Sequence, residues 1–227
     1  MIKGIFFDAA GILYRRAMPT ADFALRLLQQ EGFPVRIDEG GTLALEELRI
    51  DAVQGLADYD QFWHSFLSLR GVGRLKKRNE LISRITAFSN DVLPVEGSAE
   101  TLSILKQRGF ILGIISDTIY PLEWKLERLR KAGVAHWIDI MACSTDLGLH
   151  KPDPAIYHNA MKQAHLAPEE SAFVGHDPRE LDGATQAGML TVAVFAGHDA
   201  RADHVCQAMH DLIFIPEFAA AIPAISP

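Results

Sequence analysis

The sequence predicts an α/β fold in which a Rossmann-like parallel sheet core carries an inserted all-α cap domain. Short apolar runs bounded by Gly, Asp or Ser recur along the chain, as expected for strands buried on both faces. From residue 94 onward these runs alternate with helical patterns, which is typical of a doubly wound sheet. Between residues 15 and 93, helical patterns follow one another without a convincing strand.

The apolar run at residues 2–7 stops at Asp8 and predicts the first strand. Further short runs rich in Ile, Val or Phe predict strands at residues 110–116, 137–143, 172–175, 190–195 and 212–215. The helices expected between them cover residues 98–108, 121–132, 154–165 and 178–187. Gly109 and Gly133 directly follow the first two of these helices, as at a helix end.

Residues 15–93 form the predicted insertion. Its helical patterns cover residues 21–31, 43–56, 61–69 and 79–88, and Pro94 marks the return to the alternating part. We therefore expect two domains in this chain. Residues 1–14 and 94–227 form the Rossmann-like core, and residues 15–93 form a helical cap over one end of the sheet.

The composition excludes several classes of protein. The 227 residues are 48 % hydrophobic and 22 % charged, which is ordinary globular usage and excludes wholesale disorder. The formal net charge of −7 argues against a nucleic-acid-binding protein, which needs a basic face. It still permits an anionic substrate, because a few local cations or one metal ion can reverse the field inside a pocket. Two cysteines, Cys143 and Cys206, support neither a disulfide scaffold nor a Cys-rich zinc site.

The same composition sets the expected surroundings and partners. The low cysteine content favours a reduced, cytoplasmic setting. No apolar run approaches the roughly 18 residues that a membrane helix needs. We expect a small-molecule substrate, no nucleic acid and no membrane as partners, and a monomer or a homodimer.

Polar side chains follow the predicted strands where ligands bind in open α/β sheets, beyond the carboxyl ends. A carboxylate nucleophile there needs an electrophile held by cations, and a neighbouring acidic pair suggests one Mg²⁺. A hydroxyl and a lysine would neutralise the oxygens of a transferring group. These side chains are, in chain order, Asp8, Ser116, Asp117, Lys151, Asp177 and Glu180.

Each of these residues alone also has an ordinary structural explanation. Asp8 and Ser116 could cap turns or helices, and Lys151 could be a solvated loop lysine. The acids between residues 177 and 182 could favour the first turn of a helix by opposing its dipole. Their order, each at the end of a predicted strand or just beyond one, is what favours a shared site.

Four segments carry a resemblance to a known family. They are residues 6–13 (FFDAAGIL), 114–117 (IISD), 151–154 (KPDP) and 173–177 (FVGHD), the last continued by 187–189 (AGM). In this order they resemble the four motifs of the haloacid dehalogenase (HAD) superfamily. The block at residues 15–93 lies where one subgroup of that superfamily carries a helical cap.

The resemblance implies roles for these residues. Asp8 would be the nucleophile that becomes a covalent intermediate, and Ser116 and Lys151 would bind the phosphoryl group. Asp117 is expected among the substrate-binding residues with them. Mg²⁺ would be held by Asp8, by the backbone carbonyl of Ala10 and by an acid of the fourth motif. Of the two candidate acids there, we favour Asp177 over Glu180.

The chain departs from the family pattern at two positions. Phosphatases of the family carry a second Asp two residues after the nucleophile, where this chain has Ala10. The loss of a general acid typically costs roughly 10²–10⁴ in rate, so hydrolysis of ordinary phosphomonoesters is in question. His176 stands where many members have a metal-binding Asp. Because Mg²⁺ prefers oxygen ligands, we favour a structural role for His176.

The expected function is Mg²⁺-dependent phosphoryl hydrolysis of a small metabolite through an aspartyl phosphate at Asp8. A first alternative is metal-independent 2-haloacid dehalogenation through an Asp8 ester, since halide leaves without a proton. A second is a catalytically weak relative that serves as a binding protein. A Schiff base on Lys76 or Lys77 is disfavoured, because both lie in a basic run with the pattern of a solvated face.

Overall fold

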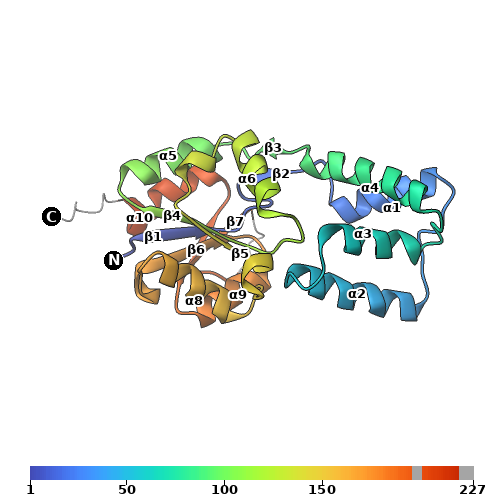
Figure 1. The fold of residues 1–227 in the computed structure, drawn as a ribbon. Coiled ribbons are helices and arrows are strands. Elements are labelled where there is room, and N and C mark those ends of the chain that lie inside the picture. The colour runs from blue at the N-terminus through green and yellow to red at the C-terminus, as the bar shows by residue number, and fades with distance from the viewer. Residues whose placement is uncertain (196–200, 220–227) are drawn as a thin grey trace.

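The computed structural model describes residues 1–195 and 201–219, and its centre is a six-stranded parallel sheet (Figure 1). The strands lie in the order β5-β4-β1-β6-β7-β8. Their bounds are β1 Gly4–Phe7, β4 Ile111–Ser116, β5 Ile140–Cys143, β6 Ser171–Gly175, β7 Leu190–Val194 and β8 His204–Cys206. The predicted fold class is confirmed.

Helices cover both faces of the sheet. On one face lie α5 (Ser98–Gln107), α6 (Leu122–Lys131) and α10 (Pro216–Ala219), and on the other lie α8 (Pro154–Gln163) and α9 (Pro178–Gln186) (Figure 1). Successive strand residues serve opposite faces, as the pleat requires. Ile5 and Phe7 pack in the core under α5 and α6, whereas Phe6 packs under α8 and α9.

The connectivity favours a ligand site beyond the end of β1. This first strand pairs with β4 on one side and β6 on the other, so the chain builds the sheet outward from β1 in both directions. Such a switch point leaves a crevice beyond the carboxyl ends of the strands, because the connections leave on opposite sides. Asp8 directly follows β1 and therefore stands at this crevice.

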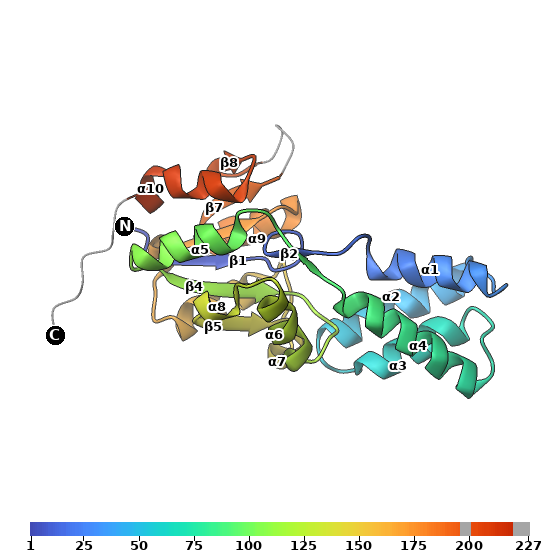
Figure 2. The same ribbon diagram turned by 90° about the horizontal axis from the view of Figure 1, so that it is seen from above.

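Four helices lie beyond that edge of the sheet: α1 Thr20–Gln30, α2 Glu39–Val53, α3 Tyr59–Ser68 and α4 Leu75–Asn90 (Figure 2). They enclose an apolar cluster of their own, in which Trp63 is the largest side chain. Four helices were predicted in this stretch, whereas the division of the chain into two domains stays a prediction.

The helical block is joined to the sheet layer by two adjacent segments. The short strands β2 (Tyr14–Arg15) and β3 (Leu93–Pro94) pair in antiparallel fashion, with Tyr14 opposite Pro94. The block also contacts the core at Gly55, where an added Cβ would lie 2.3 Å from the carbonyl oxygen of Thr145. Because Gly55 also has a φ of +74°, no other residue fits this approach without strain.

One predicted strand is wrong. Residues 212–214 belong to the 3₁₀ helix η3 (Met209–Phe214) and Ile215 directly follows it, and the sixth strand is instead β8. Leu212 and Ile215 are buried in the core beside α5, which a helical turn achieves as well as a strand. Asp211 stabilises the start of the turn by accepting hydrogen bonds from the backbone N–H groups of Gln207 and Ala208, both at 2.9 Å.

The other boundaries differ little from those expected. The strand expected at 137–143 begins later, at Ile140, because Ala135–Trp137 forms a 3₁₀ turn. Residues 196–200 and 220–227 of the predicted core lie outside the described residues. Among the described residues, no helix is long and apolar enough to cross a membrane.

Candidate active site

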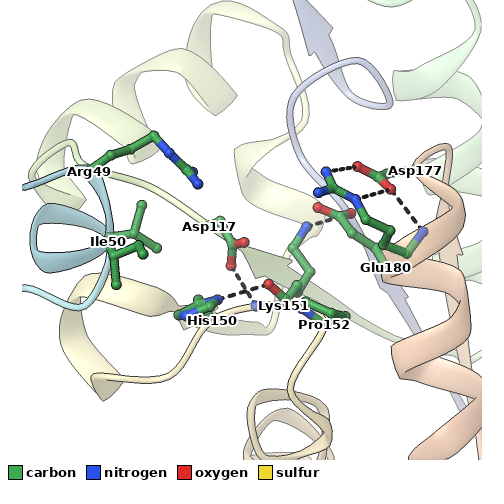
Figure 3. A pocket seen from close by; sticks show the side chains of 10 residues that line it. Arg49, Ile50, Asp117, His150, Lys151, Pro152, Asp177 and Glu180 are labelled. Atoms are coloured by element: carbon green, nitrogen blue, oxygen red, sulfur yellow. Dashed lines mark hydrogen bonds and ion pairs between the residues drawn. The ribbon is translucent and has the colours of Figure 1, made fainter. Parts of the chain in front are cut away.

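Lys151 is the centre of the candidate site. Its Nζ lies 2.8 Å from Oε2 of Glu180 (Figure 3). The same Nζ lies 2.7 Å from Oδ1 of Asp8, and the Lys151 side chain is only 1 % exposed. Asp8 and Glu180 therefore meet at the ammonium group of Lys151, and the sequence predicted that these three residues share a site. Its backbone N–H donates to Oδ1 of Asp117 at 2.9 Å, which adds the carboxylate that follows β4.

Helix α9 holds the Lys151 loop in place from the other side. A Cβ on Gly183 would lie 2.3 Å from the carbonyl oxygen of Pro152, so only glycine lets α9 approach this closely. The hydroxyl of Tyr157 on α8 donates to the backbone carbonyl of Glu180 at 2.7 Å. These contacts fix the first turns of α9 against the loop, and thereby the carboxylate of Glu180 beside Lys151.

The site holds more carboxylate charge than its one ammonium group can neutralise. Burial and, to a smaller extent, the Asp8 carboxylate together raise the pKa of Glu180 to about 7, against the opposing effect of Lys151. Burial also raises the pKa of Asp117. Burial would lower the pKa of Lys151, but Asp8 and Glu180 outweigh it and hold that pKa above its usual range.

This donor set fits a hard divalent cation. Mg²⁺ binds through one or two carboxylates and prefers oxygen ligands, and Asp8 and Glu180 offer carboxylate oxygens in a cluster with excess negative charge. Within the described ranges, no three His, Cys, Asp or Glu residues already form a metal-binding group. The chemistry of the residues present therefore suits Mg²⁺, although no complete ligand shell is formed in advance.

The two acids of the fourth motif lie in different surroundings. Asp177, which the sequence favoured as the metal ligand, is held by Arg179 through both carboxylate oxygens, at 3.3 and 2.9 Å. It also caps α9 by accepting from the backbone N–H of Arg179. Hydrogen bonding to Arg179 lowers the pKa of Asp177. Glu180 is thus the acid in direct contact with the Lys151–Asp8 pair.

His176 lies beside the nucleophile position without a close bond to it. Its Nδ1 is 3.8 Å from Oδ2 of Asp8, and its side chain is 44 % exposed. Because this distance exceeds that of a hydrogen bond, the ring flanks the Asp8 carboxylate instead of binding it.

Ser116 is brought to the same edge, but its hydroxyl contacts a residue that the sequence analysis missed. Ser116 is buried, and its Oγ accepts a hydrogen bond from Nζ of Lys125 at 2.6 Å. Lys125 lies on α6, three residues after Leu122 and four before Leu129. That spacing puts the lysine on the apolar stripe of the helix, a signal that could have marked it as buried.

A cavity of about 200 Å³ opens between this cluster and the helical block (Figure 3). Its walls from the core include Asp117, Lys151 and Glu180, and its wall from α2 includes Arg49 and Ile50. Arg49 was not singled out from the sequence, because nothing in the pattern of α2 shows which face meets the core. The arrangement can bind an anionic group beside Lys151, whose ammonium group contacts the Asp8 carboxylate.

A model of the haloacid dehalogenase-like hydrolases matches residues 26–194 of the chain. A glyceraldehyde 3-phosphate phosphatase of Methanothermobacter thermautotrophicus is 30 % identical and covers 90 % of this chain and 91 % of its own length. A second such enzyme, from Methanopyrus kandleri, is 27 % identical over 87 % of this chain and 85 % of its own.

The solved structures that resemble the chain share its fold. A 2-haloacid dehalogenase from Pseudomonas syringae pv. Tomato DC3000 superposes with a TM-score of 0.68 at 24 % sequence identity. The match covers 93 % of this chain and 96 % of the dehalogenase. At this level of identity the similarity describes the architecture alone.

Proposed function

The chain belongs to the haloacid dehalogenase-like hydrolases, and from that premise we propose that it is a Mg²⁺-dependent phosphatase of a small metabolite. The observation that supports this most is the buried contact between Lys151 and Asp8. An ammonium group 2.7 Å from Oδ1 fixes the position of the Asp8 carboxylate, the nucleophile of the proposal, and attracts the oxygens of a phosphoryl group.

The proposed reaction has two displacements. A carboxylate oxygen of Asp8 attacks phosphorus, the bond from phosphorus to the leaving oxygen breaks, and an aspartyl phosphate forms. Water then attacks that phosphorus, the bond to Asp8 breaks, and inorganic phosphate leaves with the carboxylate restored. Through both steps Lys151 and the hydroxyl of Ser116 hold the phosphoryl oxygens, with Asp117 fixing the backbone of Lys151.

We assign the Mg²⁺ ligands to Asp8, the backbone carbonyl of Ala10 and an acid after β6. The contact of Glu180 with the Lys151–Asp8 pair supports Glu180 as that acid, with Asp177 as the alternative that the motif resemblance favoured. When bound, Mg²⁺ supplies positive charge that neutralises the phosphoryl oxygens. The excess of carboxylate charge around Lys151 supports this assignment.

Glyceraldehyde 3-phosphate is the first substrate to test. Two relatives that match most of the chain are phosphatases of this compound, and a cavity of about 200 Å³ suits a small molecule. Its leaving group is an alkoxide that must take up a proton, and Ala10 cannot supply one. Substrates whose leaving group departs unprotonated, such as acyl or aryl phosphates, therefore belong in the same test.

Ala10 also favours a second candidate function, 2-haloacid dehalogenation. Here a carboxylate oxygen of Asp8 attacks the carbon that bears the halogen, and halide leaves without a proton. Water then hydrolyses the resulting Asp8 ester. This chemistry needs no metal ion, and the contact of Lys151 with Asp8 would serve it equally well.

The deciding experiment assays a panel of phosphorylated metabolites and 2-haloacids with Mg²⁺ and with a chelator. The proposal expects phosphate release that needs Mg²⁺ and falls to background in Asp8→Asn, which keeps the size of the side chain but removes the nucleophile. Asp22→Asn, at an exposed position of α1, is the matched control and should keep full activity.

Three outcomes would contradict the proposal. Halide release without Mg²⁺ would make the protein a dehalogenase. More than a few per cent of turnover in a folded Asp8→Asn variant would exclude the covalent mechanism. A protein that binds members of the panel but turns over none of them would be a binding relative.

A further inference from the structure

Three cations gather around the buried Tyr14 without a carboxylate partner, and one of them, Lys125, contacts Ser116. Lys125 and Arg128 on α6 are 2 % and 1 % exposed, and Arg16 follows β2. All three act on the buried Tyr14, whose pKa is lowered by them although burial opposes this. Among the described residues, no ion pair joins any of the three to an Asp or Glu.

Such a cluster costs free energy of folding unless something else compensates. A buried charge without a counter-charge loses its hydration and gains no ion pair in return. Arg16 Nη2 and Arg128 Nη1 are buried and have no hydrogen-bond partner. The other guanidinium nitrogens of Arg128 and Nε of Arg16 contact Ser89 and Asn90, at the end of α4, and so have a structural purpose.

Lys125 has no such purpose in joining the helical block to the core. Within the described part of the chain, the one hydrogen bond of its side chain runs from Nζ to Oγ of Ser116, at 2.6 Å. An ammonium group can only donate, so Ser116 is the acceptor, and the hydroxyl proton must point to another acceptor. In the structure it points to the backbone carbonyl of Asp117 at 3.3 Å, a long bond that a better acceptor would displace.

We propose that Lys125 is a positioning residue that turns the Ser116 hydroxyl into a donor for the phosphoryl group, and that this group is the missing counter-charge of the cluster. This inference rests on the proposed phosphatase function. Lys125 polarises the O–H bond and blocks the lone pair that faces it, so Ser116 offers its proton to an anion. The neighbouring guanidinium groups of Arg16 and Arg128 add to the positive charge around Tyr14, next to Lys125.

The proposal predicts that replacing Lys125 weakens phosphate binding without lowering the stability of the folded state. Lys125→Met keeps the volume of the side chain and removes an uncompensated buried charge, so the folded state should keep or gain stability. Binding of phosphate should nevertheless weaken, because the Ser116 hydroxyl is no longer oriented or polarised. If Lys125 had a merely structural role, Lys125→Met would lower phosphate affinity and stability together.

The test measures the affinity of the full-length protein for inorganic phosphate by calorimetry in Mg²⁺, together with the thermal midpoint of each variant. Lys125→Met should weaken binding by about tenfold to a hundredfold, the usual range for a charge-assisted hydrogen bond. Lys125→Arg keeps a charged donor and should restore most of the affinity. Lys131→Met is the matched control, since Lys131 is an exposed lysine of the same helix that bonds to the backbone of Asn90.

A double-mutant cycle shows whether Lys125 acts through Ser116. If it does, Lys125→Met combined with Ser116→Ala weakens phosphate binding no more than Ser116→Ala alone. Additive losses, or a fall in thermal midpoint that accompanies the loss of binding, would overturn the proposal. If Ser116→Ala itself leaves phosphate binding unchanged, the proposed role of Ser116 fails first. If Ser116→Ala weakens binding and Lys125→Met does not, only the role of Lys125 fails.

Discussion

Arg128 on α6 donates two hydrogen bonds to the same atom, Oδ1 of Asn90, through Nε at 3.1 Å and Nη2 at 2.9 Å. Asn90 is the last residue of α4, where unpaired carbonyls and the helix dipole favour a cation. Arg128 therefore fastens the end of the helical block to the helix that lies over the sheet.

We expect Arg128→Met to lower the free energy of unfolding by about 2–3 kcal/mol, because it leaves Asn90 and Ser89 without their buried partner. Urea denaturation measures this change. Arg130→Met, which removes an exposed pair with Glu127 on the same helix, should change stability by no more than about 0.5 kcal/mol. Equal effects of the two variants would refute the fastening role.

The raised pKa of Glu180 makes stability depend on pH. Its ordinary value is 4.5 and its value in the folded protein is about 7, so the folded state favours the protonated form. The stability contributed by this group is complete below about pH 4.5 and is lost as the pH rises through about 7. Integrated over that window, the loss is on the order of 3 kcal/mol at most.

In a chelator, Glu180→Gln should therefore flatten the dependence of the unfolding free energy on pH between about 4.5 and 7. Mg²⁺ should have a similar effect on the unmodified protein, because a bound cation favours the ionised carboxylate. Glu170 provides the control, since hydrogen bonding to Lys3 lowers its pKa. Glu170→Gln should therefore change the dependence of the unfolding free energy on pH in the opposite direction. An unchanged slope in Glu180→Gln would show that folding does not raise the pKa of Glu180.

Ala10 predicts a steep dependence of kcat/KM on the pKa of the leaving group. Aryl and acyl phosphates should be hydrolysed faster than alkyl phosphates, whose alkoxide must be protonated as the bond breaks. Ala10→Asp adds an acid and should flatten the dependence by accelerating alkyl phosphates, whereas Ala10→Asn should not. A flat dependence in the unmodified enzyme would mean that another group already donates the proton.

Arg49 should act on substrate binding from the helical block, because it lines the cavity opposite Lys151 (Figure 3). Arg49→Met should raise KM severalfold and leave kcat nearly unchanged. Glu46→Gln, which releases Arg49 from its 2.7 Å ion pair, should not raise KM. Arg26→Met, at an exposed position of α1, is the control. A fall in kcat with constant KM would place the effect of Arg49 in the chemical step instead.

The inner strands of the sheet were predictable because both of their faces are buried. Every residue of β1 and β6 is buried, so their sequences are continuous apolar runs. Strand β8 lies at the edge of the sheet and has a mixed burial pattern, so no such run marks it. The apolar run at 212–215 is as short as a strand, and its periodicity cannot distinguish a strand from a buried helical turn.

The site residues that follow strands could be predicted, because the strands themselves could be predicted. Asp8, Lys151 and Glu180 follow strands that lie near one another in the sheet, so their meeting follows from topology. Lys125 and Arg49 lie within helices, and their roles depend on which helix face meets the sheet edge. Packing between distant segments decides this, and local sequence patterns do not record it.

Because Tyr14 pairs with Pro94 in β2 and β3, the polypeptide leaves the sheet layer and returns to it at a single place. An antiparallel pair of strands can be closed by a turn of about two residues, so the whole intervening segment could be cut out and the ends rejoined. Recombination at β2 and β3 could exchange one inserted segment for another without shifting the register of any strand in the six-stranded sheet. A gene with this layout can acquire a different helical segment while it keeps the strand ends that carry the candidate site.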